Sequence, residues 1–134
     1  MSIRISVVSA MAAALLGAGL AQAATAPLPP GNAVKGKAMF NQQCMLCHSA
    51  AAGQEGAAPT LFGVVGRKAA SDSGYTGYSR ALKASGLTWT TANLNTFLSG
   101  PAKLVPGTAM PITVNGAQDR ANIVAYLASL KGTH

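Results

Sequence analysis

The sequence predicts an all-α domain of about four short helices, joined by long loops that are rich in Gly and Pro. Three observations support this fold class. Apolar residues recur at helical spacing in four segments, which begin or end at capping and breaking residues. No segment alternates in the way that a half-buried strand does. The loops between the helical segments hold most of the 15 Gly residues of the chain.

The first two helices are expected at residues 33–44 and 80–85. Asn32 provides an N-cap for the first helix, which follows the proline-rich stretch A-P-L-P-P-G. Ser79 provides a cap for the second helix, and a glycine ends it. The chain between them, above all residues 48–67, shows no helical periodicity. A loop of this length is unusual in a compact domain unless another group organises it.

Two further helices are expected, one that begins after a cap at Thr90 or Thr91 and one at about residues 117–130. The pair Gly100-Pro101 ends the third helix, so residues 102–115 are expected to form a second irregular loop. The inner faces of these two helices carry Leu94, Phe97 and Leu98 in the third, and Ile123, Leu127 and Leu130 in the fourth. Their spacing is that of an amphipathic helix packed on a core.

Residues 1–23 are predicted to be a secretory signal peptide. Arg4 is the one charge near the start, a run of small and apolar residues follows, and Ala21-Gln22-Ala23 has the A-x-A pattern of a cleavage site. The apolar run is about 15 residues long, whereas a membrane span needs roughly 20, so an uncleaved anchor fits less well. We expect cleavage after Ala23, a flexible lead-in at residues 24–32, one domain at residues 33–134 and a periplasmic location.

Charged residues are few and mostly basic. Without Arg4, nine Lys and Arg residues remain against three acids, which gives a formal charge of +6. The cations are scattered and no basic run with interleaved aromatics occurs, so the sequence argues against nucleic-acid binding. A positive surface on an exported protein instead suits an acidic protein partner or anionic lipid headgroups.

The apolar side chains are too small to fill a core unaided. The chain has one Trp, three Tyr and three Phe residues, and alanine supplies much of its apolar fraction. A large buried cofactor would explain both the missing bulk and the long loops.

The stretch Q-C-M-L-C-H at residues 43–48 identifies the kind of cofactor. C-x-x-C-H is the attachment signature of c-type haem, in which Cys44 and Cys47 each add to a vinyl group and His48 becomes the proximal iron ligand. Other uses of the motif fit less well. A disulfide would close a very small loop, and thioredoxin-type chemistry expects a βαβ context. A zinc site would have to recruit His134 and adjacent ligands.

Met110 is the expected distal ligand of the iron. It lies in the stretch P-G-T-A-M-P, in a loop that two prolines stiffen, some sixty residues after the attachment motif. Met39 is assigned to packing, and Met45 lies within the motif and cannot reach across the ring. His134, the last residue of the chain, is a weaker candidate.

With these features the chain resembles class I cytochromes c of the mitochondrial-like bacterial type. The resemblance runs from residue 34 to residue 130 and rests on G-K-A-M-F-N-Q-Q-C-M-L-C-H, G-A-A-P-T-L-F-G-V-V-G-R, Y-S-R-A-L-K-A-S-G-L-T-W, P-G-T-A-M and R-A-N-I-V-A-Y-L. It implies the cytochrome c fold wrapped around one haem, with Gly36 and Phe40 close to Tyr126.

The resemblance also implies roles around the haem. Pro59 would accept a hydrogen bond from His48 Nδ1, and Thr108 would support the loop of Met110. The donors of hydrogen bonds to a buried propionate would be Arg67, Tyr78 and Trp89.

The sequence departs from the family pattern near the haem. Phe97 stands where relatives commonly carry a tyrosine whose hydroxyl touches the axial methionine, and Leu82 stands where an asparagine is common. Mitochondrial relatives ring the exposed haem edge with lysines. At three such positions this chain has Gln43, Ala102 and Ala109, with only Lys103 close by.

We therefore expect a monomeric carrier of single electrons, not an enzyme and without a permanent membrane span. Its partners would be redox proteins: a membrane cytochrome complex, a terminal oxidase, a reaction centre or a periplasmic dehydrogenase. Glu55, Asp72 and Asp119 are expected in separate places, so they form no acid–base pair. Two alternatives remain open. One is an open-site c-haem enzyme or sensor, and the other is a cytochrome subunit of a larger periplasmic oxidoreductase complex.

Overall fold

A computed structural model describes residues 28–131. The predicted signal peptide, its cleavage site, residues 24–27 of the lead-in and His134 lie outside the described residues. The helices are α1 (Ala33–Gln43), α2 (Arg80–Ala84), α3 (Thr91–Ser99), α4 (Pro101–Leu104) and α5 (Ala117–Ser129). Over residues 28–131 the one β-type contact is an isolated antiparallel bridge between Lys68 and Thr88. The all-α prediction is confirmed.

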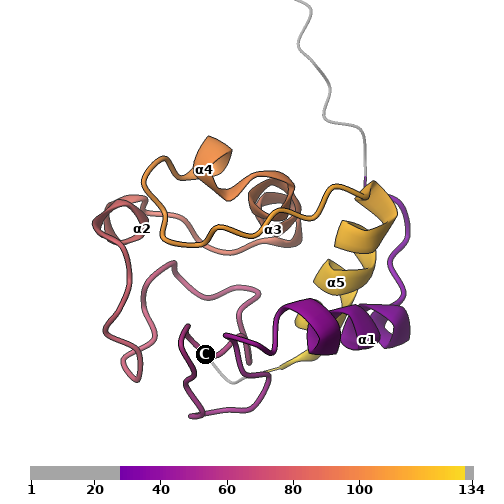
Figure 1. Ribbon diagram of the computed structural model, residues 1–134, viewed down its shortest axis with the longest axis horizontal. Coiled ribbons are helices and arrows are strands. Elements are labelled where there is room, and N and C mark those ends of the chain that lie inside the picture. Colours follow the sequence, from indigo (N-terminus) through magenta and orange to yellow (C-terminus); the bar gives the residue numbers. More distant parts are fainter. Residues whose placement is uncertain (1–27, 132–134) are drawn as a thin grey trace, which may run out of the picture.

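Helices α1 and α5 form the main helix–helix contact and cross at one side of the molecule (Figure 1). Gly36 permits this contact, because a side chain there would collide with the backbone carbonyl of Asn122. The rings of Phe40 and Tyr126 pack at the same crossing, with centroids 5.3 Å apart. The buried Asn122 Oδ1 also accepts a hydrogen bond from the backbone N–H of Asn32, at 2.9 Å. The expected approach of the two helices is therefore present.

Helix α4 corrects the sequence prediction, which placed a loop from residue 102 and expected about four helices. Gly100 ends α3, and the next residue, Pro101, occupies the first turn of α4. Proline is favoured there, because its fixed φ suits a helix and its missing N–H would have no partner in the first turn. A Gly-Pro pair can thus end one helix and begin the next.

Capping residues define the other helix boundaries. Asn32 and Ser79 each accept a hydrogen bond from a backbone N–H in the first turn of α1 and α2. Thr90 and Asn93 form a reciprocal capping box at the start of α3, which satisfies two backbone donors. The starts of α1 and α2 match the sequence prediction, and Thr90 is one of the two caps expected for α3. Each predicted end lies within one residue of the observed one.

Much of the long loop between α1 and α2 lies on the side of the molecule opposite α3 and α4, whereas the loop between α4 and α5 runs beside α3 (Figure 1). Backbone hydrogen bonds tie residues 63–69 to the rest of the fold. Gly63 N–H donates to Leu130 O at 2.8 Å, and Gly66 N–H donates to Trp89 O at 2.7 Å. Gly63 and Gly66 both have positive φ, at 63° and 92°, which glycine adopts without the strain that a Cβ would bring. Within residues 28–131 no helix combines the length and the apolar character that a membrane crossing requires.

Candidate functional site

The two cysteines and His48 lie on a helical turn that continues α1. Cys44 is the C-cap of α1, and its carbonyl accepts hydrogen bonds from the N–H of Cys47 and of His48. This turn brings both thiols and the imidazole to the lining of one cavity. Both thiols are free, and burial raises the pKa of the Cys44 thiol. The arrangement suits two thioether bonds to one flat group that also meets the imidazole.

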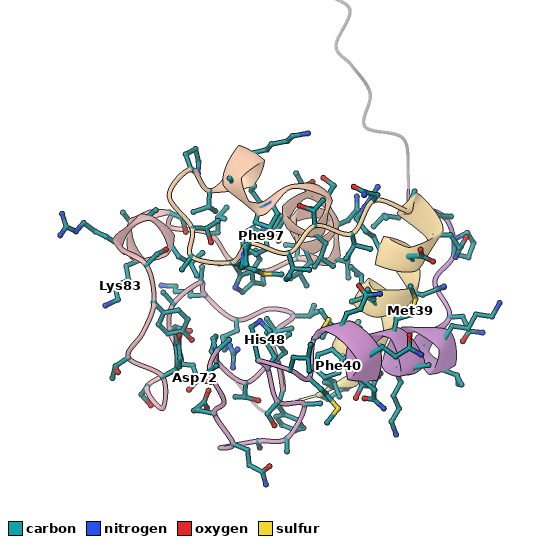
Figure 2. All side chains as sticks on the ribbon, viewed as in Figure 1. Met39, Phe40, His48, Asp72, Lys83 and Phe97 are labelled. Carbon is teal, nitrogen blue, oxygen red and sulfur yellow. The ribbon has the colours of Figure 1, made fainter. Side chains whose placement is uncertain are left out.

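The cavity has a volume of about 390 Å³ and mostly apolar walls. Its inner wall is formed by core side chains, which are Phe40, Val64, Trp89, Leu94, Phe97, Leu98, Ile123 and Leu127. The volume lies in the range of small-molecule and cofactor sites. Figure 2 places His48 on the loop side of the cavity and Phe97 on the side of α3. The core therefore contains room for a large cofactor, as the scarcity of large apolar side chains in the sequence predicted.

A hydrogen bond to Pro59 fixes the ring of His48. The Nδ1 atom of His48 lies 2.7 Å from the carbonyl oxygen of Pro59. A carbonyl can only accept, so Nδ1 carries the proton and Nε2 keeps its lone pair for a metal. Burial lowers the pKa of His48, and the hydrogen bond to Pro59 opposes that shift. A neutral imidazole with a free Nε2 is the form that binds iron.

Met110 reaches the same cavity from the loop between α4 and α5. The backbone N–H of Met110 donates to Thr108 Oγ1 at 3.4 Å. Thr108 N–H in turn donates to Val105 O at 3.0 Å, and Gly107 between them has φ 87°. The turn presents the half-buried Met110 to the cavity that His48 also lines. Thr108 thus accepts a hydrogen bond within the loop of Met110, and its role in supporting iron binding stays a prediction.

Three polar side chains, Arg67, Tyr78 and Trp89, line one flank of the cavity. Arg67 is largely buried, with its side chain 16% exposed, and Arg67 Nη1 pairs with Asp72 Oδ2 at 2.9 Å. Burial raises the pKa of Tyr78, and the charge of the neighbouring Arg67 opposes that shift. The structure therefore gathers the three residues that the resemblance assigned to a carboxylate of the cofactor.

Glu55 and Asp72 correct the expectation that the acidic residues lie in separate places. A side chain at Gly74 would meet Glu55 Oε1 at 3.1 Å and Asp72 Oδ1 at 3.3 Å, so the two carboxylates are neighbours. Glu55 Oε2 accepts a hydrogen bond of 2.6 Å from the backbone N–H of Thr60. The hydrogen bond between Glu55 and Thr60 was not predicted, because both residues lie in a loop without periodicity.

Phe97 and Leu82 are the two apolar side chains at which the sequence departs from the family pattern. Phe97 is buried on the cavity wall and packs edge-on against Trp89, with ring centroids 5.0 Å apart. Leu82 also lines the cavity, at the end near α2. Neither side chain can donate a hydrogen bond, so this part of the wall is drier than a tyrosine and an asparagine would make it.

The residues present fit a covalently bound haem. Two thiols, a nitrogen with a free lone pair, a thioether and the side-chain donors of Arg67, Tyr78 and Trp89 all line the same cavity. The walls between them are apolar, as a porphyrin ring requires.

Comparison with known proteins gives the same assignment. Residues 33–131 match the family model of cytochrome c. The chain is 43% identical over 104 residues to cytochrome c2 of Rhodopila globiformis, covering 77% of this chain and 97% of that one. It is 41% identical over 121 residues to cytochrome c2 of Rhodomicrobium vannielii, covering 89% and 94%.

A solved structure is also similar. The structure of cytochrome cH from Methylobacterium extorquens superimposes with a TM-score of 0.68 at 42% identity, covering 74% of this chain and 99% of that one. The relatives are electron-transfer proteins rather than enzymes. The cofactor is accordingly one haem c, attached through Cys44 and Cys47, and the chain is a haem-based electron carrier. This chain belongs to the cytochrome c family.

Proposed function

We propose that this protein is an exported carrier of single electrons in which His48 Nε2 and Met110 Sδ bind the haem iron from opposite sides. The observation that carries the proposal is the placement of these side chains, which line one apolar cavity from two separate loops. The bound haem supplies the one-electron couple between ferric and ferrous iron. A thioether paired with an imidazole raises the reduction potential, and two protein ligands leave no open position for oxygen chemistry.

The chain's own residues keep this geometry the same in both oxidation states. Cys44 and Cys47 anchor the cofactor, and Pro59 holds the His48 ring in one orientation. The turn at Thr108 holds the backbone of Met110. The apolar walls exclude water and competing ligands, which supports electron transfer without ligand exchange.

The rim of the cavity suggests how partners dock. Leu46, Ala109, Pro111 and Ile112 line the cavity and are also exposed to solvent. None of these four is charged, and the exposed Lys68 is the one cation besides the largely buried Arg67 among the described residues that line the cavity. Contact at the rim formed by the four would depend on apolar burial more than on ion pairs. The partners that we propose are a membrane cytochrome complex, a terminal oxidase, a reaction centre or a periplasmic dehydrogenase. The secretory leader predicted at residues 1–23 supports the periplasmic location that we propose, and we propose a monomer.

Two matched substitutions test the ligation. Met110→Leu and Met39→Leu each replace a thioether by a side chain of similar volume, but only Met110 lines the cavity. Holoprotein should be produced together with a haem-attachment apparatus and examined by absorption spectroscopy and redox titration. The wild-type and Met39→Leu ferric proteins should show the weak sulfur-to-iron charge-transfer band toward the red end of the spectrum.

Met110→Leu should lose that band, bind CO in the ferrous state and have a lower reduction potential. A Met110→Leu protein that keeps both the band and the potential of the wild type would exclude Met110 as the ligand. Size-exclusion chromatography of the native periplasmic fraction tests the free carrier, which should elute alone rather than with a dehydrogenase partner.

A further inference from the structure

One peptide group connects His48 to a carboxylate. The carbonyl of Pro59 and the N–H of Thr60 belong to the same amide. The carbonyl oxygen lies 2.7 Å from His48 Nδ1, and the N–H donates to Glu55 Oε2 at 2.6 Å. The imidazole and the carboxylate therefore bind opposite ends of a single planar, conjugated unit.

We propose that Glu55 is a positioning residue for His48 that acts through the Pro59–Thr60 peptide group and lowers the reduction potential. A carboxylate that accepts the amide proton polarises the amide and makes its carbonyl a stronger acceptor. A stronger acceptor draws the Nδ1 proton of His48 further and makes Nε2 a better electron donor. A better donor favours ferric over ferrous iron. The inference rests on the proposed binding of iron by His48.

The peptide group is held rigidly enough to transmit this effect. Thr60 is 3% exposed, and hydrogen bonds fix it on three sides besides the contact with Glu55. Its Oγ1 donates to Ala51 O at 2.8 Å and accepts from the N–H of Phe62 at 3.1 Å. Its carbonyl accepts from Arg67 Nη2 at 2.6 Å. The amide therefore cannot turn away when the strength of one contact changes.

The charge of Glu55 is directed at this amide. Glu55 Oε1 is buried and has no hydrogen-bond partner within residues 28–131. Among those residues, the carboxylate therefore accepts its hydrogen bond through Oε2, from the N–H of Thr60. The nearby cation, Arg67, is engaged by Asp72 at 2.9 Å instead. Asp72 thus carries a second negative charge in the same region, but its oxygens bind Arg67 and Gly74 N–H rather than the amide of Thr60.

This difference between the two carboxylates provides the test. Glu55→Gln removes the charge but keeps an oxygen that can accept from Thr60, and Asp72→Asn removes a charge in the same region without touching the amide. Both variants should be prepared as holoprotein and compared with the wild type by redox titration. The proton on His48 Nδ1 should be followed by NMR in the ferrous protein.

Glu55→Gln should raise the midpoint potential and move the His48 Nδ1–H resonance to lower frequency, because the hydrogen bond to Pro59 weakens. Asp72→Asn should raise the potential less and leave that resonance in place. The proposal is overturned if Glu55→Gln leaves the Nδ1–H resonance at its wild-type position, since any change in potential would then be a plain effect of charge. It is also overturned if Asp72→Asn moves the resonance as far as Glu55→Gln does.

The wild-type protein gives a second measurement that needs no variant. A short bond to a carboxylate should place the Thr60 amide proton at unusually high frequency, and an ordinary chemical shift there would contradict the proposal. The ferric wild type separates this inference from the ligation itself. Ring protons of His48 without a paramagnetic shift would mean that His48 is not bound to iron, which would overturn the proposed function and this inference together.

Discussion

Gly36 of α1 lies directly against the backbone carbonyl of Asn122 in α5. The contact has no room for a Cβ atom, and the Cβ of Tyr126, one turn further along α5, borders the same space. We expect Gly36→Ala to force the two helices apart. Although alanine is favoured over glycine within a helix by about 1 kcal/mol, overpacking of this kind costs about 1–3 kcal/mol. The clash is with backbone, which moves less readily than a side chain, so the net effect should be destabilising.

Guanidinium denaturation of the holoprotein should give a lower free energy of unfolding for Gly36→Ala than for the wild type. Lys37→Ala provides the matched control, because it lies on the same helix and is exposed. Its effect should stay within about 0.5 kcal/mol. An unchanged stability of Gly36→Ala would mean that the crossing of α1 and α5 is looser than the structure indicates.

Loss of the haem should unfold most of the domain. Without haem, the apolar walls of a cavity of about 390 Å³ would lose the atoms that they pack against, and such a void lowers the stability of a core. The whole stability of a small domain is only about 5–15 kcal/mol. The double variant Cys44→Ala/Cys47→Ala should therefore release its pigment in acidified acetone and lose most of its helical circular dichroism.

The two single variants serve as controls, because each keeps one thioether bond and should retain pigment on the chain after the same extraction. A double variant that folds as well as the wild type without haem would show that the cavity walls can close on themselves.

Tyr78 should make the protein less stable at alkaline pH. Burial raises the pKa of its phenol in the folded protein above the ordinary value, and Arg67 opposes this only in part. Above about pH 10 the unfolded chain releases the proton first, so the folded state holds more protons and stability falls as pH rises. The contribution of the Tyr78 phenol to the free energy of unfolding is complete below the pKa of the unfolded chain. It is lost as the pH rises through the higher pKa of the folded protein.

Unfolding by guanidinium at a series of pH values would measure that slope. Tyr78→Phe cannot ionise, so its stability should fall less steeply over the same pH range. Equal slopes for Tyr78→Phe and the wild type would assign the alkaline loss to other groups.

The positions of the helices could be predicted because short-range signals define them. Asn32, Ser79 and Thr90 bind the first turns of their helices through contacts three residues away, and the sequence displays such contacts directly. Helix α4 was missed because Gly100-Pro101 reads as a terminator, whereas the structure also uses Pro101 to begin a helix. The haem motif was recognisable for the same reason as the caps, since its three functional residues are close in sequence.

The contacts within the long loops could not be predicted. Tyr75 donates to Ala57 O across eighteen residues at 3.1 Å, and Glu55 and Asp72 become neighbours through the same fold-back. No periodic pattern marks such pairs, because loop conformation depends on single turns rather than on a repeated spacing. The role that we propose for Glu55 therefore depends on the structure, which shows the two hydrogen bonds of the peptide group between Pro59 and Thr60.

The apolar rim of the cavity should govern electron transfer between molecules. Leu46 is 81% exposed and lines the cavity, whereas Val34 is 80% exposed on α1 and does not. Leu46→Glu and Val34→Glu therefore make the same change in net charge at two apolar positions with nearly the same exposed fraction. Electron self-exchange between ferric and ferrous copies, measured by NMR line broadening, reports on close approach at the cofactor edge without requiring a partner.

In a self-exchange pair, Leu46→Glu would bring two carboxylates to the contact, where they repel each other and lose water. We expect the self-exchange rate to fall roughly tenfold, which corresponds to about 1.4 kcal/mol in the barrier. Val34→Glu should leave the rate unchanged or raise it slightly, because it lowers the positive charge that the two copies share. Equal rates in the two variants would mean that electrons leave the molecule elsewhere than at the rim formed by Leu46 and Ile112.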